Sequence, residues 1–260
     1  MTDEQQPVQP EPAPEAAAPV SAPAPQPERV PFWGYADLFL FAGLSLPCVF
    51  AAWALVRVAI NVFRLRSGAQ AVESVLVMAL GYAFLFGLMA LIFRVQYDRP
   101  FWRSLGWTEA RVPILWNVIC GFGAAYFVSF IGSLIRTPPT SGPIVEIMKG
   151  LTAQIIVGIF GVTVAPLCEE LVFRGFLQPL LVRSLGAVCG IGLAAALFGA
   201  LHYSEYGASW RNALQIGIAG AAFGYMRHRT GSTKSAVIMH ASFNSLSFIS
   251  LLAQGRNPLH

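Results

Sequence analysis

The sequence predicts an all-α fold, a polytopic bundle of about seven to eight membrane-spanning helices behind a disordered N-terminal tail. Of the 260 residues, 55% are hydrophobic and only 12% are charged, and the mean hydropathy is +0.59. In a soluble domain about a quarter of the residues carry charge. The apolar residues also gather in stretches close to the roughly 20 residues that cross a hydrocarbon core. We therefore expect an integral membrane protein.

Residues 1–34 form the first expected unit, a tail rich in proline, alanine and glutamate. Residues 1–31 hold 9 of the 18 prolines. Such a segment buries too little apolar surface to fold, so disorder is predicted. It has no basic region followed by an apolar core, so we do not expect a cleaved secretory signal. The tail carries a charge of −4 and the rest of the chain +8. It is interpreted as a solvated extension or a tether for a partner.

Residues 35–256 form the second expected unit, a transmembrane helical domain. Pro47 predicts a kink in its first span, which a bundle can absorb. The fifth and sixth apolar stretches are short for a span, and an extra helix near 140–150 would raise the count to eight. The seven stretches lie near 37–57, 72–93, 113–135, 151–171, 187–203, 211–226 and 235–253.

The connections between these stretches carry most of the basic residues, a pattern that orients helices and gives no support to nucleic-acid binding. Their distribution favours a cytoplasmic tail by a small margin. Residues 99–107 mix arginines with aromatic side chains, which is typical of an anchor at the headgroup level. Gly217, Gly220 and Gly224 predict a close approach between helices. The four cysteines show no metal-binding spacing and are expected to be buried apolar side chains.

Three charged residues, Glu169, Glu170 and Arg174, end the fourth apolar stretch. An ionised residue at the centre of a membrane helix costs roughly 2.5 to 3.5 kcal/mol, so charges that are kept there indicate a function. Glu170 and Arg174 are four residues apart, share a helix face and should pair. Glu169 is rotated by about 100° from Glu170 and is left as a candidate general base. The alternative is an ion-pair network without chemistry.

Two later stretches add histidines. Phe198 and His202 are four residues apart at the end of the fifth stretch, and His240 and Asn244 repeat this spacing in the last one. Residues at this spacing share a helix face. His240 and Asn244 either hydrogen-bond to each other and to a neighbouring helix, or converge with Glu169 and His202 on a water or a metal ion.

Taken together, the order of these motifs closely resembles that of the CPBP family, also called Abi. This family comprises the type II CAAX prenyl endopeptidases and bacterial bacteriocin-processing or immunity proteins. The motifs lie between residues 166 and 244, and a looser resemblance begins at 105–107. The resemblance implies an intramembrane endopeptidase with a catalytic core at about 113–254. It assigns catalytic roles to Glu169, His202, His240 and Asn244, and supporting roles to Glu170, Arg174 and Phe198.

Two mechanisms fit these residues. In the first, His202, His240 and a third group hold a Zn²⁺ ion, which lowers the pKa of its bound water to about 7 while Glu169 accepts the proton. In the second there is no metal: Glu169 and His202 activate water, and His240 with Asn244 donate hydrogen bonds to the oxyanion. Asparagine is a poor zinc ligand, which is the weak point of the first mechanism. Both mechanisms stay open.

The expected substrate is a membrane-associated protein or peptide, either a CAAX-type tail or a bacteriocin-type leader, and the expected location is the bacterial cytoplasmic (inner) membrane. Two other classes stay open. One is a non-catalytic immunity or scaffold protein, in which the charged cluster binds a partner. The other is a proton- or ion-coupled transporter, which predicts charges in several spans and an internal repeat. The charges lie mainly in the C-terminal half and no repeat is visible, so the transporter is the weaker alternative.

Overall fold

The computed structural model describes residues 30–63 and 70–255, and within these ranges it contains helices and no strands. The predicted all-α class is confirmed. The helices are α1 (Tyr35–Val62), α2 (Gln70–Tyr97), α3 (Phe101–Ser104), α4 (Ile114–Leu134), α5 (Pro143–Ile147), α6 (Leu151–Val162), α7 (Val164–Glu170), the π-helix η1 (Leu171–Leu177), α8 (Gln178–Leu201), α9 (Trp210–Thr230) and α10 (Thr233–Gly255).

Five helical segments within the described residues are long and apolar enough to cross a membrane. This count is smaller than the seven expected stretches for two reasons. The stretches at 151–171 and 187–203 fall within one run of 51 helical residues, but the backbone of Gly186 (φ 79°, ψ 168°) is not helical and separates the second stretch as a helix of its own. The stretch at 211–226 does form α9, but this helix ends in Arg227, His228 and Arg229 and is too polar to qualify.

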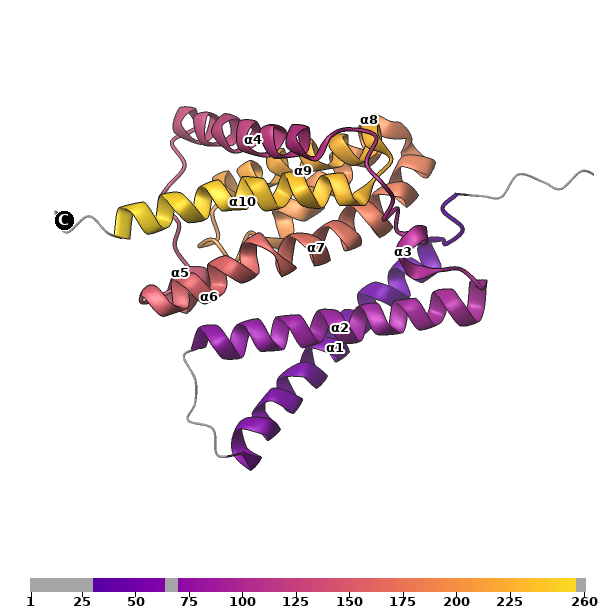
Figure 1. The fold of residues 1–260 in the computed structure, drawn as a ribbon, viewed down its shortest axis with the longest axis horizontal. Helices are drawn as coiled ribbons and strands as arrows, with labels where there is room; N and C mark the ends of the chain where they lie inside the picture. The colour runs from indigo at the N-terminus through magenta and orange to yellow at the C-terminus, as the bar shows by residue number, and fades with distance from the viewer. Residues whose placement is uncertain (1–29, 64–69, 256–260) are drawn as a thin grey trace, which may run out of the picture.

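The helices form two groups that meet along α2 and α6. Helices α1 and α2 pack against each other, and α2 also packs against α6. The remaining long helices form a bundle in which α8 packs along α9 and α10 packs along α4 (Figure 1). The bends at Thr163 and Gly186 fold the 51-residue segment, so α6, α7, η1 and α8 can contact different neighbours. The residues of the charged motif lie at the centre of this bent segment, in α7 and η1.

The structure also differs from the expected boundaries at the N-terminal end. Pro31 and Trp33, assigned to the tail, are buried, and Trp33 joins an apolar cluster with residues of α2, η1 and α8. Residues 1–29, which make up the rest of the predicted tail, lie outside the described residues. The prediction of buried cysteines holds for Cys48 and Cys168, holds only in part for the half-buried Cys120, and is wrong for Cys189, which is exposed.

Candidate active site

The predicted pair between Glu170 and Arg174 is confirmed. Nη1 of Arg174 donates to Oε1 of Glu170 at 2.8 Å, and both side chains are completely buried. Nη2 of Arg174 donates to the backbone carbonyl of Gly220 in α9 at 2.6 Å. Because a buried charge must be paired and hydrogen-bonded to be tolerated, these contacts explain how the cluster sits inside the bundle.

Helix α9 reaches the cluster because two of its residues lack side chains. A Cβ atom on Gly220 would lie 2.9 Å from the ring of Phe198 and 3.0 Å from Nη2 of Arg174. Gly224 stands next to Gln178, whose side-chain amide donates to the carbonyl of Gly224 at 2.9 Å. The predicted close approach at these two glycines is thus found, and the approach lets side chains of η1 and α8 bond to the backbone of α9.

His240 is the histidine that contacts the charged cluster. Its Nδ1 atom lies 2.8 Å from Oε1 of Glu170, and its Nε2 atom lies 3.9 Å from Oε2 of Glu169. The carboxylate of Glu170, paired with Arg174, can only accept hydrogen bonds, so Nδ1 of His240 carries the proton. In the neutral imidazole Nε2 then presents a lone pair toward Glu169. The two adjacent glutamates therefore meet opposite sides of one ring.

Aromatic rings enclose this imidazole. Phe223 of α9 stacks on His240 with ring centroids 4.4 Å apart and planes 19° from parallel. The ring of Phe198 lies 5.9 Å from that of His240, and the guanidinium carbon of Arg174 lies 4.6 Å from the centroid of Phe198. A cation over an aromatic face is attracted by the ring quadrupole. Phe198 thus supports both the ion pair and the histidine.

His202 ends α8 and lies at the edge of the site. Its Nδ1 atom is 2.7 Å from the carbonyl oxygen of Phe198, and its ring centroid is 4.7 Å from that of Phe198. A carbonyl only accepts, so Nδ1 donates and Nε2 is again the free nitrogen. That Nε2 atom lies 4.0 Å from Oε2 of Glu205 in the loop that follows. The two histidines are linked through the ring of Phe198.

Asn244 lies one turn beyond His240, but its amide is engaged elsewhere. Nδ2 of Asn244 donates to the carbonyl oxygen of Gly161 in α6 at 2.7 Å. This bond ties α10 to the end of α6, immediately before the bend at Thr163. One N–H of the amide remains beyond this bond, because a carboxamide nitrogen has two.

Three side chains that sequence reasoning did not select surround these residues. Glu205 and Tyr206 follow His202, and Tyr82 comes from α2; all three are within electrostatic reach of Glu169. Partial burial raises the pKa of the Glu205 carboxyl, whose side chain stays 42% exposed, and nearby His202 offsets part of this rise. Burial, followed by the charges of Glu205 and Glu169, raises the pKa of the Tyr206 hydroxyl. Only the proximity of Glu205 to His202 in sequence could have indicated any of them.

The candidate side chains include the imidazole and carboxylate groups that zinc ions bind, but they are not placed close enough together to hold one. Both histidines use Nδ1 for a hydrogen bond and leave Nε2 free, which is the usual arrangement of metal-binding histidines. A structural or catalytic zinc ion takes at least three protein ligands. Within the described residues, no three histidine, cysteine, aspartate or glutamate side chains gather closely enough to hold one. The residues as placed do not fit zinc, so no catalytic step is derived through a metal.

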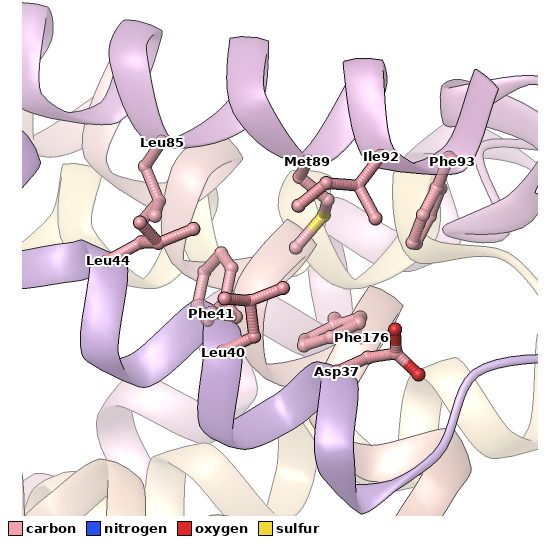
Figure 2. Close-up of a pocket in the computed structure, with 9 residues that line it drawn as sticks. All are labelled: Asp37, Leu40, Phe41, Leu44, Leu85, Met89, Ile92, Phe93 and Phe176. Carbon is pink, nitrogen blue, oxygen red and sulfur yellow. The ribbon is translucent and has the colours of Figure 1, made fainter. Parts of the chain in front are cut away.

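Two hollows elsewhere in the molecule are separate from this site. One is an apolar pocket between α1 and α2, bounded by Phe176 and with Asp37 at one side (Figure 2). The other is a groove of small residues between α8 and α9, flanked by Tyr203 and Trp210. Neither hollow is lined by Glu169, His202, His240 or Asn244. The candidate site is therefore defined by the contacts among these side chains and not by a pocket.

Fold and site define an integral, multi-pass membrane protein of helices with a buried cluster of carboxylates and imidazoles. Residues 151–246, just over a third of the chain, match the family model described as Type II CAAX prenyl endopeptidase Rce1-like. The matched segment contains all three motifs that carry the resemblance to the CPBP family, and the resemblance is confirmed over these residues. No curated protein and no solved structure matches the chain.

Proposed function

We propose that this protein is an intramembrane endopeptidase that hydrolyses a peptide bond of a membrane-associated protein or peptide in a bacterial cytoplasmic membrane. The observation that carries the proposal is the contact of His240 with both glutamates, 2.8 Å to Glu170 and 3.9 Å to Glu169. It gives Glu169 an acid–base partner while Glu170 and Arg174 neutralise each other. The family match over residues 151–246 supports the same reaction class.

In the proposed reaction Glu169 is the general base. Its carboxylate removes a proton from a water molecule as the water oxygen bonds to the scissile carbonyl carbon. The protonated Glu169 then delivers this proton to the leaving amine nitrogen as the C–N bond breaks. His202, with Nε2 free, is proposed to hold the same water by accepting its second hydrogen bond. Each proton is accounted for, and no metal is required.

Stabilisation of the oxyanion is proposed to come from Asn244 and His240. Asn244 has a second amide hydrogen besides the one bonded to Gly161. His240 can join Asn244 as a donor from Nε2 only as an imidazolium, which requires a second proton taken up from water before the substrate binds, because the proton on Nδ1 is engaged by Glu170. Glu170 would then face an imidazolium, a charge-assisted hydrogen bond. Removing one donor of this kind typically costs a factor of about 10² to 10³ in kcat.

The test compares cleavage by wild type, Glu169→Gln and Glu109→Gln in detergent. Glutamine keeps the shape of Glu169 and removes the base, so we expect a loss of about 10² to 10⁴ in rate. Glu109 is a matched control because its side chain is exposed and pairs with Lys234, away from the candidate site. The substrates are membrane-anchored peptides of two kinds, with a prenylated C-terminal CAAX sequence or with an internal leader-type site. Mass spectrometry locates the cut.

A zinc chelator added to each reaction tests the metal prediction. Cleavage that persists in the chelator and disappears in Glu169→Gln supports the metal-free mechanism. Cleavage lost in the chelator and restored by zinc shows that the metal mechanism is correct. Equal cleavage by wild type and Glu169→Gln contradicts the proposed site. Cleavage by neither, with a partner captured equally by both, would favour the immunity or scaffold alternative.

A further inference from the structure

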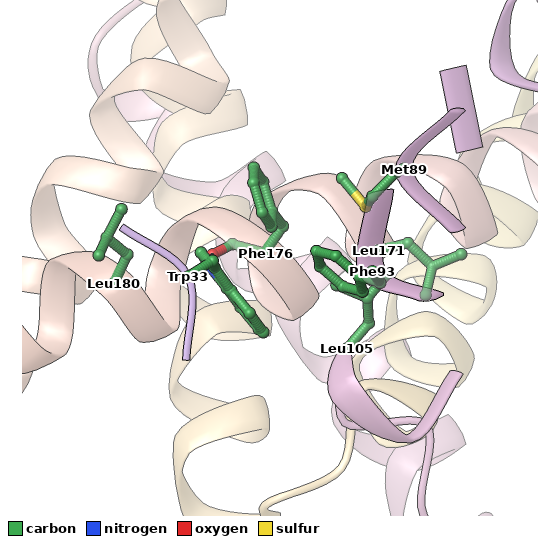
Figure 3. Packing of buried hydrophobic residues seen from close by; sticks show 7 residues of the cluster. All are labelled: Trp33, Met89, Phe93, Leu105, Leu171, Phe176 and Leu180. Atoms are coloured by element: carbon green, nitrogen blue, oxygen red, sulfur yellow. The ribbon is translucent and has the colours of Figure 1, made fainter. Parts of the chain in front are cut away.

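The segment Pro31–Trp33, just before α1, is anchored on the π-helix that follows the two glutamates. Trp33 is only 2% exposed, and its Nε1 atom donates to the carbonyl oxygen of Phe176 at 3.1 Å. Figure 3 shows Trp33 beside Phe176 and Phe93, within the apolar cluster that also holds Leu171 of η1. The indole is therefore in contact with the helix that carries Arg174.

Two rings hold the indole between α2 and η1. Trp33 stacks on Phe93 of α2 and on Phe176 of η1, with centroids 5.4 Å apart in both cases and planes 21° and 25° from parallel. Phe32 adds an edge-to-face contact with Phe93 at 5.1 Å. Pairs of aromatic side chains in such geometries contribute about 0.5 to 1.5 kcal/mol beyond the area they bury.

Arg183 of α8 holds the backbone of the same segment. Its Nη1 atom donates to the carbonyl oxygen of Pro31, and its Nη2 atom donates to that of Trp33 at 3.2 Å. Arg183 lies nine residues after Arg174, beyond the C-terminal end of η1. Its two bonds go to the segment before α1 and not to a candidate catalytic residue. It acts on the segment that touches η1.

A π-helix has a wider turn than an α-helix and is uncommon, so it depends on external contacts to persist. Here η1 is held from two sides. On one side Arg174 and Gln178 bond to the backbone of α9. On the other side Trp33 bonds to Phe176, and Gly175 lies against the backbone of Leu105, whose carbonyl oxygen would be 2.9 Å from a Cβ atom there.

We propose that Pro31–Trp33 is a latch that sets the position of η1 and thereby holds Glu170 and Arg174 where Glu170 orients His240. This inference rests on the proposed function. Trp33 and Arg183 are positioning residues in it, because they act through Phe176 and the latch rather than on the substrate. A segment outside the family match of residues 151–246 thus tunes the reaction.

The test is a double-mutant cycle with Trp33→Phe and Arg183→Met, measured as kcat and KM. Phenylalanine keeps the ring contacts and removes the N–H donor, and methionine keeps an apolar stem. Each single variant is expected to lower kcat by about 5- to 30-fold with KM within twofold. Because both act through one latch, the double variant should lose little more than the worse single variant. Trp116→Phe, at an exposed tryptophan of α4, is the matched control.

The pH profile of kcat separates positioning from mere destabilisation. A displaced Glu170 changes the hydrogen bond that orients His240, so the pH profile of kcat for Trp33→Phe should move relative to wild type. Three outcomes would each overturn the proposal. The losses in kcat could multiply in the double variant, or the change could be confined to KM. The pH profile could also stay unchanged while kcat falls only in proportion to the loss of folded protein.

A measurement independent of activity keeps the two proposals distinguishable. In histidine-selective ¹⁵N NMR, the Nδ1 signal of His240 reports its hydrogen bond to Glu170. The signal should shift in Trp33→Phe and in Arg183→Met but not in Trp116→Phe. If wild type cleaves no peptide, the proposed function fails, and this signal still decides the latch: an unshifted signal overturns it.

Discussion

Glu170 accepts two hydrogen bonds at one oxygen atom: Nη1 of Arg174 and Nδ1 of His240 each lie 2.8 Å from its Oε1. Three side chains from two distant parts of the sequence thus form one buried network. The neighbouring Glu169 takes no part in it and stays 3.9 Å from the other nitrogen of His240. The adjacent glutamates are therefore unequal, since Glu170 pairs with Arg174 and orients the imidazole, while Glu169 faces the other nitrogen of the same ring.

Glu170→Gln should destabilise the protein strongly. The substitution leaves the buried guanidinium of Arg174 without its counter-charge, and breaking a buried ion pair in this way costs about 3 to 5 kcal/mol. Chemical unfolding in detergent measures the change. The control is Glu73→Gln, which breaks a partly exposed pair with Arg57 and should cost about 1 kcal/mol or less. Similar losses in both variants would show that the buried network is not the source of stability.

Gly220→Ala should lower both stability and activity. The added methyl group would lie 2.9 Å from the ring of Phe198 and 3.0 Å from Nη2 of Arg174, so α9 must move away from η1. Overpacking of this kind costs about 1 to 3 kcal/mol. Gly123→Ala in α4 is the control, because nothing lies within 4 Å of its added atom. That control should be neutral or slightly stabilising, as alanine is favoured over glycine in helices. Equal behaviour of the two variants would contradict the packing argument.

Glu205→Gln should stabilise the protein above the ordinary titration range of a carboxyl group. Burial raises the pKa of Glu205, so the folded protein keeps a proton that the unfolded chain loses near its usual pKa of about 4.3. The stability that this proton contributes is present at low pH, and it is lost as the pH rises from the pKa of the unfolded chain through the raised pKa of the folded protein. The difference in Tm between Glu205→Gln and wild type should be near zero below about pH 4 and grow positive above it. A difference in Tm that does not change with pH for Glu205→Gln would refute the assignment.

Asn244→Asp should abolish most activity and weaken the contact between α10 and α6. A carboxylate cannot donate to the carbonyl of Gly161 and cannot stabilise an oxyanion, so we expect a loss of about 10² to 10³ in kcat and a cost of about 1 to 3 kcal/mol from the unmet hydrogen bond. Ser245→Ala, which removes only a bond from Oγ to the carbonyl of Ala241 in the same helix, is the neighbouring control. Retained activity in Asn244→Asp would remove Asn244 from the proposed reaction.

The sequence by itself determined the features that depend on neighbours within one helix. The spacing of four between Glu170 and Arg174 predicted their pair, because such residues share a helix face whatever the helix packs against. The same rule placed Phe198 beside His202. Long apolar stretches predicted a helical membrane protein, since a bilayer requires every backbone group to be satisfied within the segment. The order of the three motifs was sufficient to indicate the family resemblance that is found over residues 151–246.

Only the tertiary structure decided which helix faces meet. The bond from His240 to Glu170, the stacking of Phe223 on His240 and the capture of Asn244 by Gly161 all join segments far apart in the chain. Each contact depends on how one helix is rotated and how deeply it is placed against another. Apolar composition cannot predict this rotation or this depth in a chain whose helices are hydrophobic on most faces. The bend at Thr163 and the burial of Trp33 have the same origin, because they are fixed by the packed bundle. The break at Gly186 is different, since its φ of +79° is a conformation that glycine adopts by local preference.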